Sequence, residues 1–209
     1  MTKKRIAVLV SGGGSNLQCL LDAQDRGEFA EIVVVSANRK AAYALERARQ
    51  RGIPAEYLST VSFPDRKTFT EALMAVLQRY EIDLVVLAGY LVILDPVFYQ
   101  AYRNRVINIH PALLPSFGGK GFYGEHVHQA VLDYGAKVSG VTVHFAEEGT
   151  DTGPIILQEA LPVLQDDDAH TLAARVLELE HRLLPQAVQL FCQDRLEING
   201  RIVRIKAGG

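Results

Sequence analysis

The chain has 209 residues, of which 48% are hydrophobic and 22% are charged, and its formal net charge at pH 7 is −2. This length and composition fit one larger domain, or at most two small ones, with a sizeable core, and the small net charge argues against nucleic acid as the main partner. The longest apolar run, residues 84–94, is too short to cross a bilayer, which takes about 20 residues. The apolar run at residues 6–10 is shorter than the ~7–15 residues of a signal peptide, so we interpret it as a first strand. We therefore expect a cytoplasmic protein with no membrane segment.

Apolar runs of strand length alternate with amphipathic segments of helix length over roughly the first half of the chain. Regular alternation of this kind predicts an α/β fold, with a Rossmann-like, mostly parallel, twisted sheet that carries helices on both faces. We expect a single domain in two halves, about 1–105 and 106–209, closed by a hairpin that turns at Asn199-Gly200. The predicted strands cover residues 5–10, 32–35, 55–58, 84–88, 106–110, 137–145, 154–162 and the arms of the hairpin at 196–205. The predicted helices cover residues 15–25, 41–51, a segment entered at 62–65, a short segment opened by 95–96, and residues 125–133 and 171–192.

Two polar residues, Asn108 and His110, end the otherwise apolar strand predicted at residues 106–110. Residues two apart in a strand point to the same face, so their side chains project side by side. Burying such groups without a partner costs about 1–3 kcal/mol each. Ligands of parallel sheets bind at the carboxyl ends of the strands. We therefore expect the pair to meet a reacting substrate, with Pro111 beside it in a loop that Pro115 closes.

A glycine-rich loop, Ser11 to Asn16, follows the first strand and opens the first predicted helix. Backbone amides at such a helix start bind anions, most often a phosphate. A dinucleotide site is disfavoured, because Leu17 occupies the position of the third glycine and no acidic residue ends the second strand. We expect a small phosphorylated ligand, and the alternative is a tight turn with no ligand. The candidate phosphate-binding residues are Gly13, Gly14, Ser15 and Asn16.

Histidines raise the alternative of a metal site, since His126 and His128 with His110 would provide three zinc ligands. However, residues two apart on a helix do not share a face, and no cysteine accompanies these histidines. We therefore expect no metal, and a surface role for His126 or His128.

Asp151 lies in a polar segment, residues 147–154, between two predicted strands. An ordinary polar turn explains this segment. The functional alternative is that Asp151 folds over His110, where a carboxylate would raise the pKa of the imidazole and hold it protonated.

Glu180 is an acid on the inward face of the last predicted helix. At about 100° per residue, apolar side chains surround it within about one-sixth of a turn. A buried carboxylate needs a partner, so we expect Glu180 to bind an amine, hydroxyls or a cation, with an internal ion pair as the alternative. The apolar residues on its face are Ala173, Val176, Leu177, Leu183, Leu184 and Ala187.

Four motifs together resemble the phosphoribosylglycinamide formyltransferases, which are folate-dependent enzymes of purine biosynthesis. The resemblance runs from the first strand to Glu180, and the motif that begins at Asn108, with its downstream aspartate, is specific for the wider formyltransferase group. The motifs are Ser11–Asn16, Leu87–Leu94, Asn108–Pro115 and Asp151–Pro154.

The resemblance implies the formyltransferase fold and transfer of a formyl group from 10-formyltetrahydrofolate to the amine of 5-phosphoribosylglycinamide. Attack by the amine creates a tetrahedral carbon with an oxyanion, which Asn108 and protonated His110 would stabilise while Asp151 assists. Glu180 would take the ribose hydroxyls, and no metal is needed. The implied folate-binding residues are Arg66 near the acidic tail, Asn108, and Leu91, Val92, Ile93 and Leu94 against the pterin.

This sequence departs from the family pattern at two positions, because some members have arginine in place of Val92 and a basic residue in place of Leu177. The glycine-rich loop at residues 117–124 closes over the substrates or serves as a plain flexible linker. We expect a monomer or homodimer.

Three other functions compete with this interpretation. A methionyl-tRNA formyltransferase would carry an additional carboxyl-terminal domain, and a formyltetrahydrofolate hydrolase an amino-terminal regulatory domain, so the chain length disfavours both. A non-catalytic phosphosugar-binding module would need the glycine loop and Glu180, but not Asn108, His110 and Asp151 together.

Overall fold

The computed structural model describes residues 3–207. It contains two compact units, of which one ends at Ile107 and the other begins at Asn108. The division falls inside strand β5 (Val106–His110), so the first unit includes the start of this strand and the second unit includes its end. That the two units form a single domain stays a prediction.

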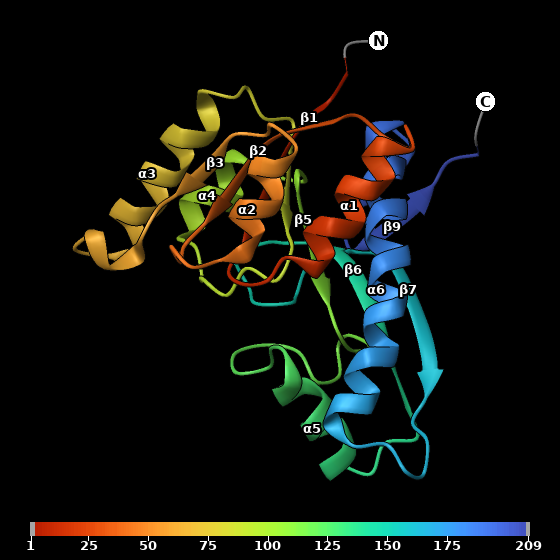
Figure 1. The fold of residues 1–209 in the computed structure, drawn as a ribbon. Coiled ribbons are helices and arrows are strands. Elements are labelled where there is room, and N and C mark those ends of the chain that lie inside the picture. Colours follow the sequence, from red (N-terminus) through yellow and green to blue (C-terminus); the bar gives the residue numbers. More distant parts are fainter. Residues whose placement is uncertain (1–2, 208–209) are drawn as a thin grey trace. The chain divides into compact units, whose positions relative to one another are not determined.

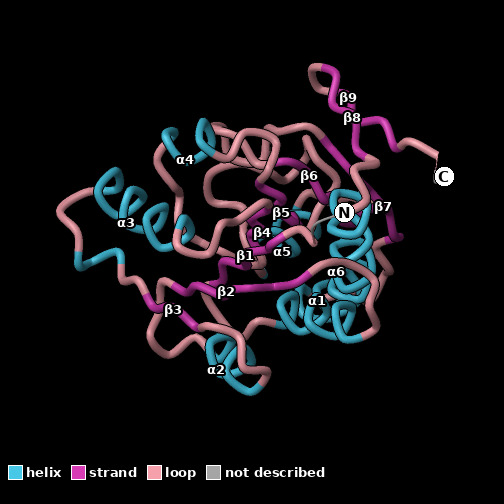
Figure 2. The backbone as a smooth tube through the Cα atoms, turned by 90° about the horizontal axis from the view of Figure 1, so that it is seen from above, coloured by secondary structure: helices cyan, strands magenta, loops and turns pink. Residues whose placement is uncertain are grey.

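The first unit contains a parallel sheet with helices on both faces, as predicted. Its central strand β1 pairs in parallel with β2 and with β4, and β2 pairs in parallel with β3. Residues Ile6 to Val10 of β1 are fully buried, which explains their unbroken apolar run. In space the strands follow the order β3 (Ala55–Tyr57), β2 (Glu31–Ala37), β1 (Arg5–Val10) and β4 (Leu84–Leu87). Helices α1 (Ser15–Asp25) and α2 (Tyr43–Gln50) cover one face, and α3 (Arg66–Gln78) and α4 (Pro96–Ala101) cover the other (Figures 1 and 2).

The second unit contains the mixed part of the fold. Strands β6 (Val138–Phe145) and β7 (Ile155–Pro162) pair in an antiparallel manner. Strand β9 (Ile202–Ile205) pairs in parallel with β7 and forms the predicted hairpin with β8 (Leu196–Asn199). Helix α5 (Glu125–Asp133) contacts α6 (Ala169–Cys192), and α6 runs along β6 and β7 (Figure 1).

Aspartates cap three of the helices at the positions where the sequence indicates helix starts. Asp65 accepts a hydrogen bond from the Thr68 amide at the start of α3, and Asp95 accepts one from the Val97 amide at the start of α4. Asp168 and Thr171 form a reciprocal capping box at the start of α6, so this helix begins two residues earlier than predicted. A 3₁₀ helix, η1 (Thr60–Ser62), precedes α3 and has no counterpart among the predicted elements. Within residues 3–207, no helix combines the length and the apolar character that a bilayer crossing requires.

Candidate active site

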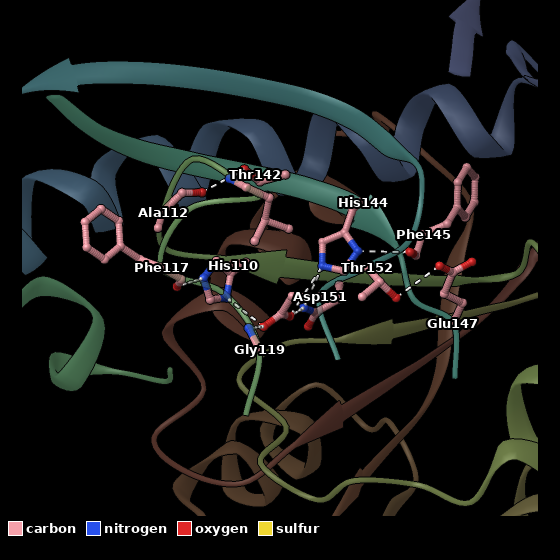
Figure 3. Close-up of polar contacts among 12 residues, drawn as sticks. His110, Ala112, Phe117, Gly119, Thr142, His144, Phe145, Glu147, Asp151 and Thr152 are labelled. Carbon is pink, nitrogen blue, oxygen red and sulfur yellow. Dashed lines mark hydrogen bonds and ion pairs between the residues drawn. The ribbon is translucent and has the colours of Figure 1, made fainter. Parts of the chain in front are cut away.

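Two predicted site residues of the second unit, Asn108 and His110, both lie within contact distance of a third, Asp151. The Nδ1 atom of His110 is 3.5 Å from Oδ2 of Asp151. The Nδ2 atom of Asn108 is 3.4 Å from Oδ1 of the same carboxylate. Figure 3 shows Asp151 between His110 and a second histidine, His144. Asp151 therefore lies over the polar end of β5, which its own position in a polar turn did not indicate.

The ring of His110 is held in one orientation. The side chain is 3% exposed, and its Nε2 atom is 2.7 Å from the carbonyl oxygen of Phe117. A carbonyl only accepts hydrogen bonds, so Nε2 carries a proton and donates it to Phe117. This bond leaves Nδ1 facing Asp151.

Burial and charge act on His110 in opposite directions. Burial lowers the pKa of His110, while the carboxylate of Asp151 and the bond to Phe117 raise this pKa, and the net shift is downward. The expected charge effect of Asp151 is therefore present, but it does not outweigh burial. His110 acquires its second proton more readily when further negative charge develops beside it.

Asp151 is held as an acceptor by groups on several sides. Its backbone adopts a left-handed conformation with φ of 57°, and Oδ2 accepts a hydrogen bond of 2.9 Å from the amide of Gly119. Burial raises the pKa of Asp151, but the neighbouring His144 and His110 and the amide of Gly119 together outweigh burial and lower it. Asp151 is thus a carboxylate at neutral pH.

His144 belongs to this cluster and was missed in the sequence. Its Nε2 atom is 3.1 Å from Nδ2 of Asn108 and 3.7 Å from Oδ1 of Asp151, while Nδ1 is 2.9 Å from the carbonyl oxygen of Phe145. The spacing of Thr142 and His144 is the signal that could have indicated it. Residues two apart in a strand share a face, so these two polar groups lie together in an otherwise apolar strand.

Thr142 anchors the loop that follows β5. Its hydroxyl donates to the carbonyl of Ala112 at 2.7 Å and accepts from the amide of Leu114 at 3.1 Å. Gln158 donates to the same hydroxyl and to the carbonyl of Leu114. The loop from Pro111 is therefore held by β6 and β7. The apolar and proline-rich part of the Asn108–Pro115 motif thus has a structural role.

Two glycines permit the close approaches on which the cluster depends. A Cβ atom on Gly153 would lie 1.7 Å from the carbonyl oxygen of Phe145, so only glycine lets the Asp151–Pro154 segment pass this strand. A Cβ atom on Gly118 would lie 2.4 Å from Leu114 and 3.4 Å from Cβ of Asp151. The loop after Phe117 thus contacts both His110 and Asp151, and its proposed closure over substrates stays a prediction.

The glycine loop of the first unit has the geometry of a helix-start anion site. Gly14 adopts a left-handed φ of 76° immediately before α1, and no side chain of the described residues caps this helix start. A Cβ atom on Gly14 would lie 2.7 Å from Cβ of Ala44. Gly13 and Ser15 are exposed, whereas Asn16 is buried. Arg47 donates to the carbonyl of Gly13 at 2.9 Å and adds a cation that the sequence-based site did not include.

The predicted folate segment contacts the glycine loop through Ser11. The Ser11 hydroxyl donates to Oδ1 of Asn38 at 2.6 Å and accepts from the amide of Leu91 at 2.9 Å. Leu91 and Ile93 are 46% and 48% exposed, whereas Leu94 is buried. Two exposed apolar side chains on one short segment suit a flat ring system.

Arg66 is a largely exposed cation at the start of α3. Its Nη2 atom is 3.7 Å from Oδ2 of Asp95, too far for a strong hydrogen bond. The guanidinium is thus accessible to an acidic ligand group.

Glu180 lies where the helical wheel places it. The side chain is 8% exposed, and buried Val176, Leu183 and Leu184 lie on the same helix. The prediction of an acid on the inward face of α6 is therefore confirmed, while its ligand stays a prediction.

The two histidines of α5 differ from each other. His126 is exposed and contacts the ring of Tyr123 edge-on. His128 is buried, so a surface role is wrong for this residue, and burial lowers its pKa. Within the described residues, no cluster of three histidine, cysteine or acidic side chains has an arrangement that would hold a metal ion.

Comparisons with known proteins agree with the motifs. A family model described as formyl transferase matches residues 4–188. The crystal structure of glycinamide ribonucleotide transformylase 1 from Symbiobacterium toebii is similar with a TM-score of 0.93 and 45% identity, and the match covers 98% of this chain and 95% of that chain. This similarity confirms the predicted fold class.

Longer relatives contain a similar region. Chloroplastic phosphoribosylglycinamide formyltransferase from Vigna unguiculata is 40% identical over 93% of this chain, which spans 62% of that protein. The trifunctional purine biosynthetic protein adenosine-3 of Bos taurus is 43% identical over 96% of this chain, which spans 20% of that protein. The family resemblance that the motifs indicate is therefore confirmed.

Proposed function

The chain belongs to the formyl transferase family, and from this premise we propose that it transfers the formyl group of 10-formyltetrahydrofolate to the amine of 5-phosphoribosylglycinamide, a step of de novo purine biosynthesis. The observation that carries the proposal is the cluster in which Asp151 contacts both Asn108 and His110. A phosphosugar-binding module has no need of such a cluster. The names of the similar proteins support the choice of substrate.

The reaction forms one carbon–nitrogen bond and breaks another. The amine nitrogen attacks the formyl carbon, and the formyl oxygen takes up negative charge. Collapse of this tetrahedral carbon then expels the folate nitrogen, which takes up one proton to balance the proton that the amine loses. The enzyme must therefore stabilise an oxyanion and move the proton of the amine.

Asn108 and His110 are the proposed oxyanion stabilisers. The amide nitrogen of Asn108 donates a hydrogen bond, and removing one donor of this kind typically costs about 10²–10³ in kcat. His110 already donates from Nε2 to Phe117, so it acts through a second proton on Nδ1. The developing oxyanion raises the pKa of His110 and opposes the effect of burial.

Asp151 is the proposed acceptor of the amine proton. Its pKa is lowered in this structure, so the carboxylate is ionised at neutral pH and free to accept. Its contact with His110 also stabilises the imidazolium form. One carboxylate thus assists both the proton-bearing histidine and the attacking amine.

The remaining residues are proposed to bind the two substrates. Gly13, Gly14, Ser15 and Asn16 bind the phosphate, and Glu180, with Pro111, binds the ribose part of the ribotide. Leu91, Val92, Ile93 and Leu94 hold the pterin, and the accessible Arg66 holds the acidic tail of the folate. The exposed apolar side chains of Leu91 and Ile93 support this assignment. Location in the cytoplasm and a monomeric or homodimeric form are part of the same proposal.

A two-substrate assay tests the function. The protein is mixed with 5-phosphoribosylglycinamide and 10-formyltetrahydrofolate, and both the tetrahydrofolate and the formylated ribotide are measured. We expect equal amounts of the two products and no turnover without the ribotide. Turnover with water alone would identify a hydrolase, and absence of turnover in the presence of bound ribotide would identify a binding module.

A further inference from the structure

We propose that His144 is a positioning residue that determines which atom of the Asn108 amide faces the reacting carbon. The inference rests on the proposed formyl transfer and adds a residue that the motifs do not include. His144 is fully buried on β6 and contacts Asn108, Asp151 and the backbone of Phe145. Figure 3 shows its ring between Asp151 and Phe145.

The hydrogen bonds of His144 define its protonation pattern. Nδ1 is 2.9 Å from the carbonyl oxygen of Phe145, which only accepts, so Nδ1 carries a proton. Nε2 is 3.1 Å from the amide nitrogen of Asn108, which only donates. The Nε2 atom therefore presents its lone pair to Asn108. The hydrogen bond from Nδ1 to Phe145 fixes this tautomer, because the bond made by one ring nitrogen of a histidine determines whether the other carries a proton.

An asparagine amide has two orientations that differ by exchange of its oxygen and nitrogen. In the observed orientation, the nitrogen of Asn108 faces Nε2 of His144 and Oδ1 of Asp151. In the reversed orientation, the amide oxygen would face a lone pair and a carboxylate, so three acceptors would meet without a proton. Buried acceptors that face one another without a donor are destabilising, which favours the observed orientation.

The two hydrogens of the Asn108 amide differ in how firmly they are held. The bond to His144 has normal length, whereas the contact with Asp151 is 3.4 Å, longer than the usual range of about 2.7–3.2 Å. We assign the second hydrogen to the oxyanion of the transition state, in exchange for its long contact with Asp151. His144 then keeps the first hydrogen and prevents rotation of the amide.

Asp151 alone is not sufficient for this positioning. As Asp151 accepts the amine proton, it becomes a weaker acceptor and a potential donor, and so loses its preference for the amide nitrogen of Asn108. In the tautomer that the Phe145 carbonyl selects, the ring proton of His144 is on Nδ1, so Nε2 is an acceptor for the Asn108 amide that does not depend on the charge of Asp151. The histidine therefore maintains the amide orientation at the moment when the carboxylate cannot.

A double-mutant cycle separates positioning from a merely structural role. His144→Phe keeps a ring of similar size and removes Nε2, and we expect kcat to fall about 10²-fold with KM changed less than about threefold. Asn108→Ala already lacks the amide, so adding His144→Phe to it should cost less than about twofold more. Losses that multiply in the double variant would overturn the proposal. His144→Gln supplies an acceptor oxygen and should recover most of the lost rate.

A spectroscopic measurement tests the same inference without activity. Nitrogen-15 NMR of the His144 ring should show a protonated Nδ1 and an unprotonated Nε2, and the Asn108 amide protons should exchange slowly in wild type and His144→Gln but rapidly in His144→Phe. A protonated Nε2 in the wild type contradicts the proposal, even if transfer is observed. Wild-type protein that shows the expected tautomer but no formyl transfer contradicts the proposed function instead. His170→Phe, at an exposed histidine near the start of α6, is the matched control and should change neither readout.

Discussion

The glycine loop of the first unit and the polar cluster of the second unit present different parts of the chain to the proposed substrates. The loop at residues 11–16 presents backbone amides, and its conformation depends on Gly14, which has a left-handed φ and lies close to Ala44. The cluster around Asp151 presents side chains, and each of them has a specified partner atom. A backbone site tolerates changes of neighbouring side chains but not a Cβ atom added where the backbone is closely packed, as at Gly14, whereas a side-chain site is sensitive even to isosteric changes. Binding and chemistry should therefore respond to different substitutions.

The largest effect on the chemistry is expected from the cluster. Asp151→Asn removes the carboxylate that accepts the proton and stabilises the charged His110, and His110→Ala removes the proton-bearing group. We expect each variant to lower kcat by about 10²–10⁴-fold, the range of general acid–base contributions. Calorimetric Kd values for the ribotide should stay within about threefold of the wild type. Equal losses in kcat and affinity would mean that these residues build the binding site and do not act in the reaction.

The next effect concerns the glycine loop and should have the opposite pattern. Gly14→Ala places a Cβ atom 2.7 Å from that of Ala44 at a left-handed φ of 76°, a strain of about 1–3 kcal/mol. We expect ribotide affinity to fall about tenfold or more, with a smaller loss of kcat at saturation. Gly12→Ala is the matched control, since a Cβ atom there meets nothing within 4 Å. Similar losses of ribotide affinity in both variants would show that the close packing at Gly14 is not required for binding.

A pH profile sharpens the assignment of His110. If its protonated form supports transfer, kcat falls as the pH rises through the pKa of His110 in the bound complex. The carboxylate of Asp151 raises that pKa, so Asp151→Asn lowers it and moves the alkaline limb of the profile toward lower pH. Residual activity of this variant, measured by single turnover across the pH range, provides the test. If the alkaline limb does not move, it reflects the titration of another group.

The smallest effect concerns stability and the buried His128. Burial lowers the pKa of His110 and of His128, so below the unfolded value of about 6.5 the unfolded chain binds protons more readily than the folded one. Stability is therefore fully present above pH ~6.5 and decreases as the pH falls toward the folded pKa values. His128→Leu should reduce this decrease, as measured by urea unfolding at pH 7.5 and 5.5. An unchanged pH dependence would show that His128 does not contribute to it.

Local patterns predicted most of the fold because they depend on short-range chemistry. Strand β5 begins and ends as predicted, since its apolar run and its polar end are both visible in five residues. Helices α3, α4 and α6 begin next to aspartates because an aspartate side chain caps free amides wherever a helix starts. Strand ends and helix caps of this kind can be predicted without knowing which distant segments pack against them.

The assembly of the site depends on distant segments and was therefore harder to predict. Asp151 reaches His110 because Gly153 lets its segment pass the carbonyl of Phe145, and nothing in the spacing of these residues indicates that approach. His144 was missed because a histidine in an apolar strand is read as core, although its partners Asn108 and Asp151 lie on other segments. The buried position of Glu180 was predictable, since one helix contains the whole pattern around it.

The single hydroxyl of Ser11 has a consequence for how this sequence can drift over evolution. It joins the glycine loop to Asn38 and to the backbone of Leu91, so the two segments proposed to bind the substrates share one oxygen atom. Alanine at this position would release both neighbours at once, whereas threonine would keep the hydroxyl. A change of side chain at residue 92 would leave this link intact, because the hydrogen bond uses the backbone amide of Leu91. Ser11 thus fixes the backbone position of residue 91 whatever side chains the adjacent residues carry.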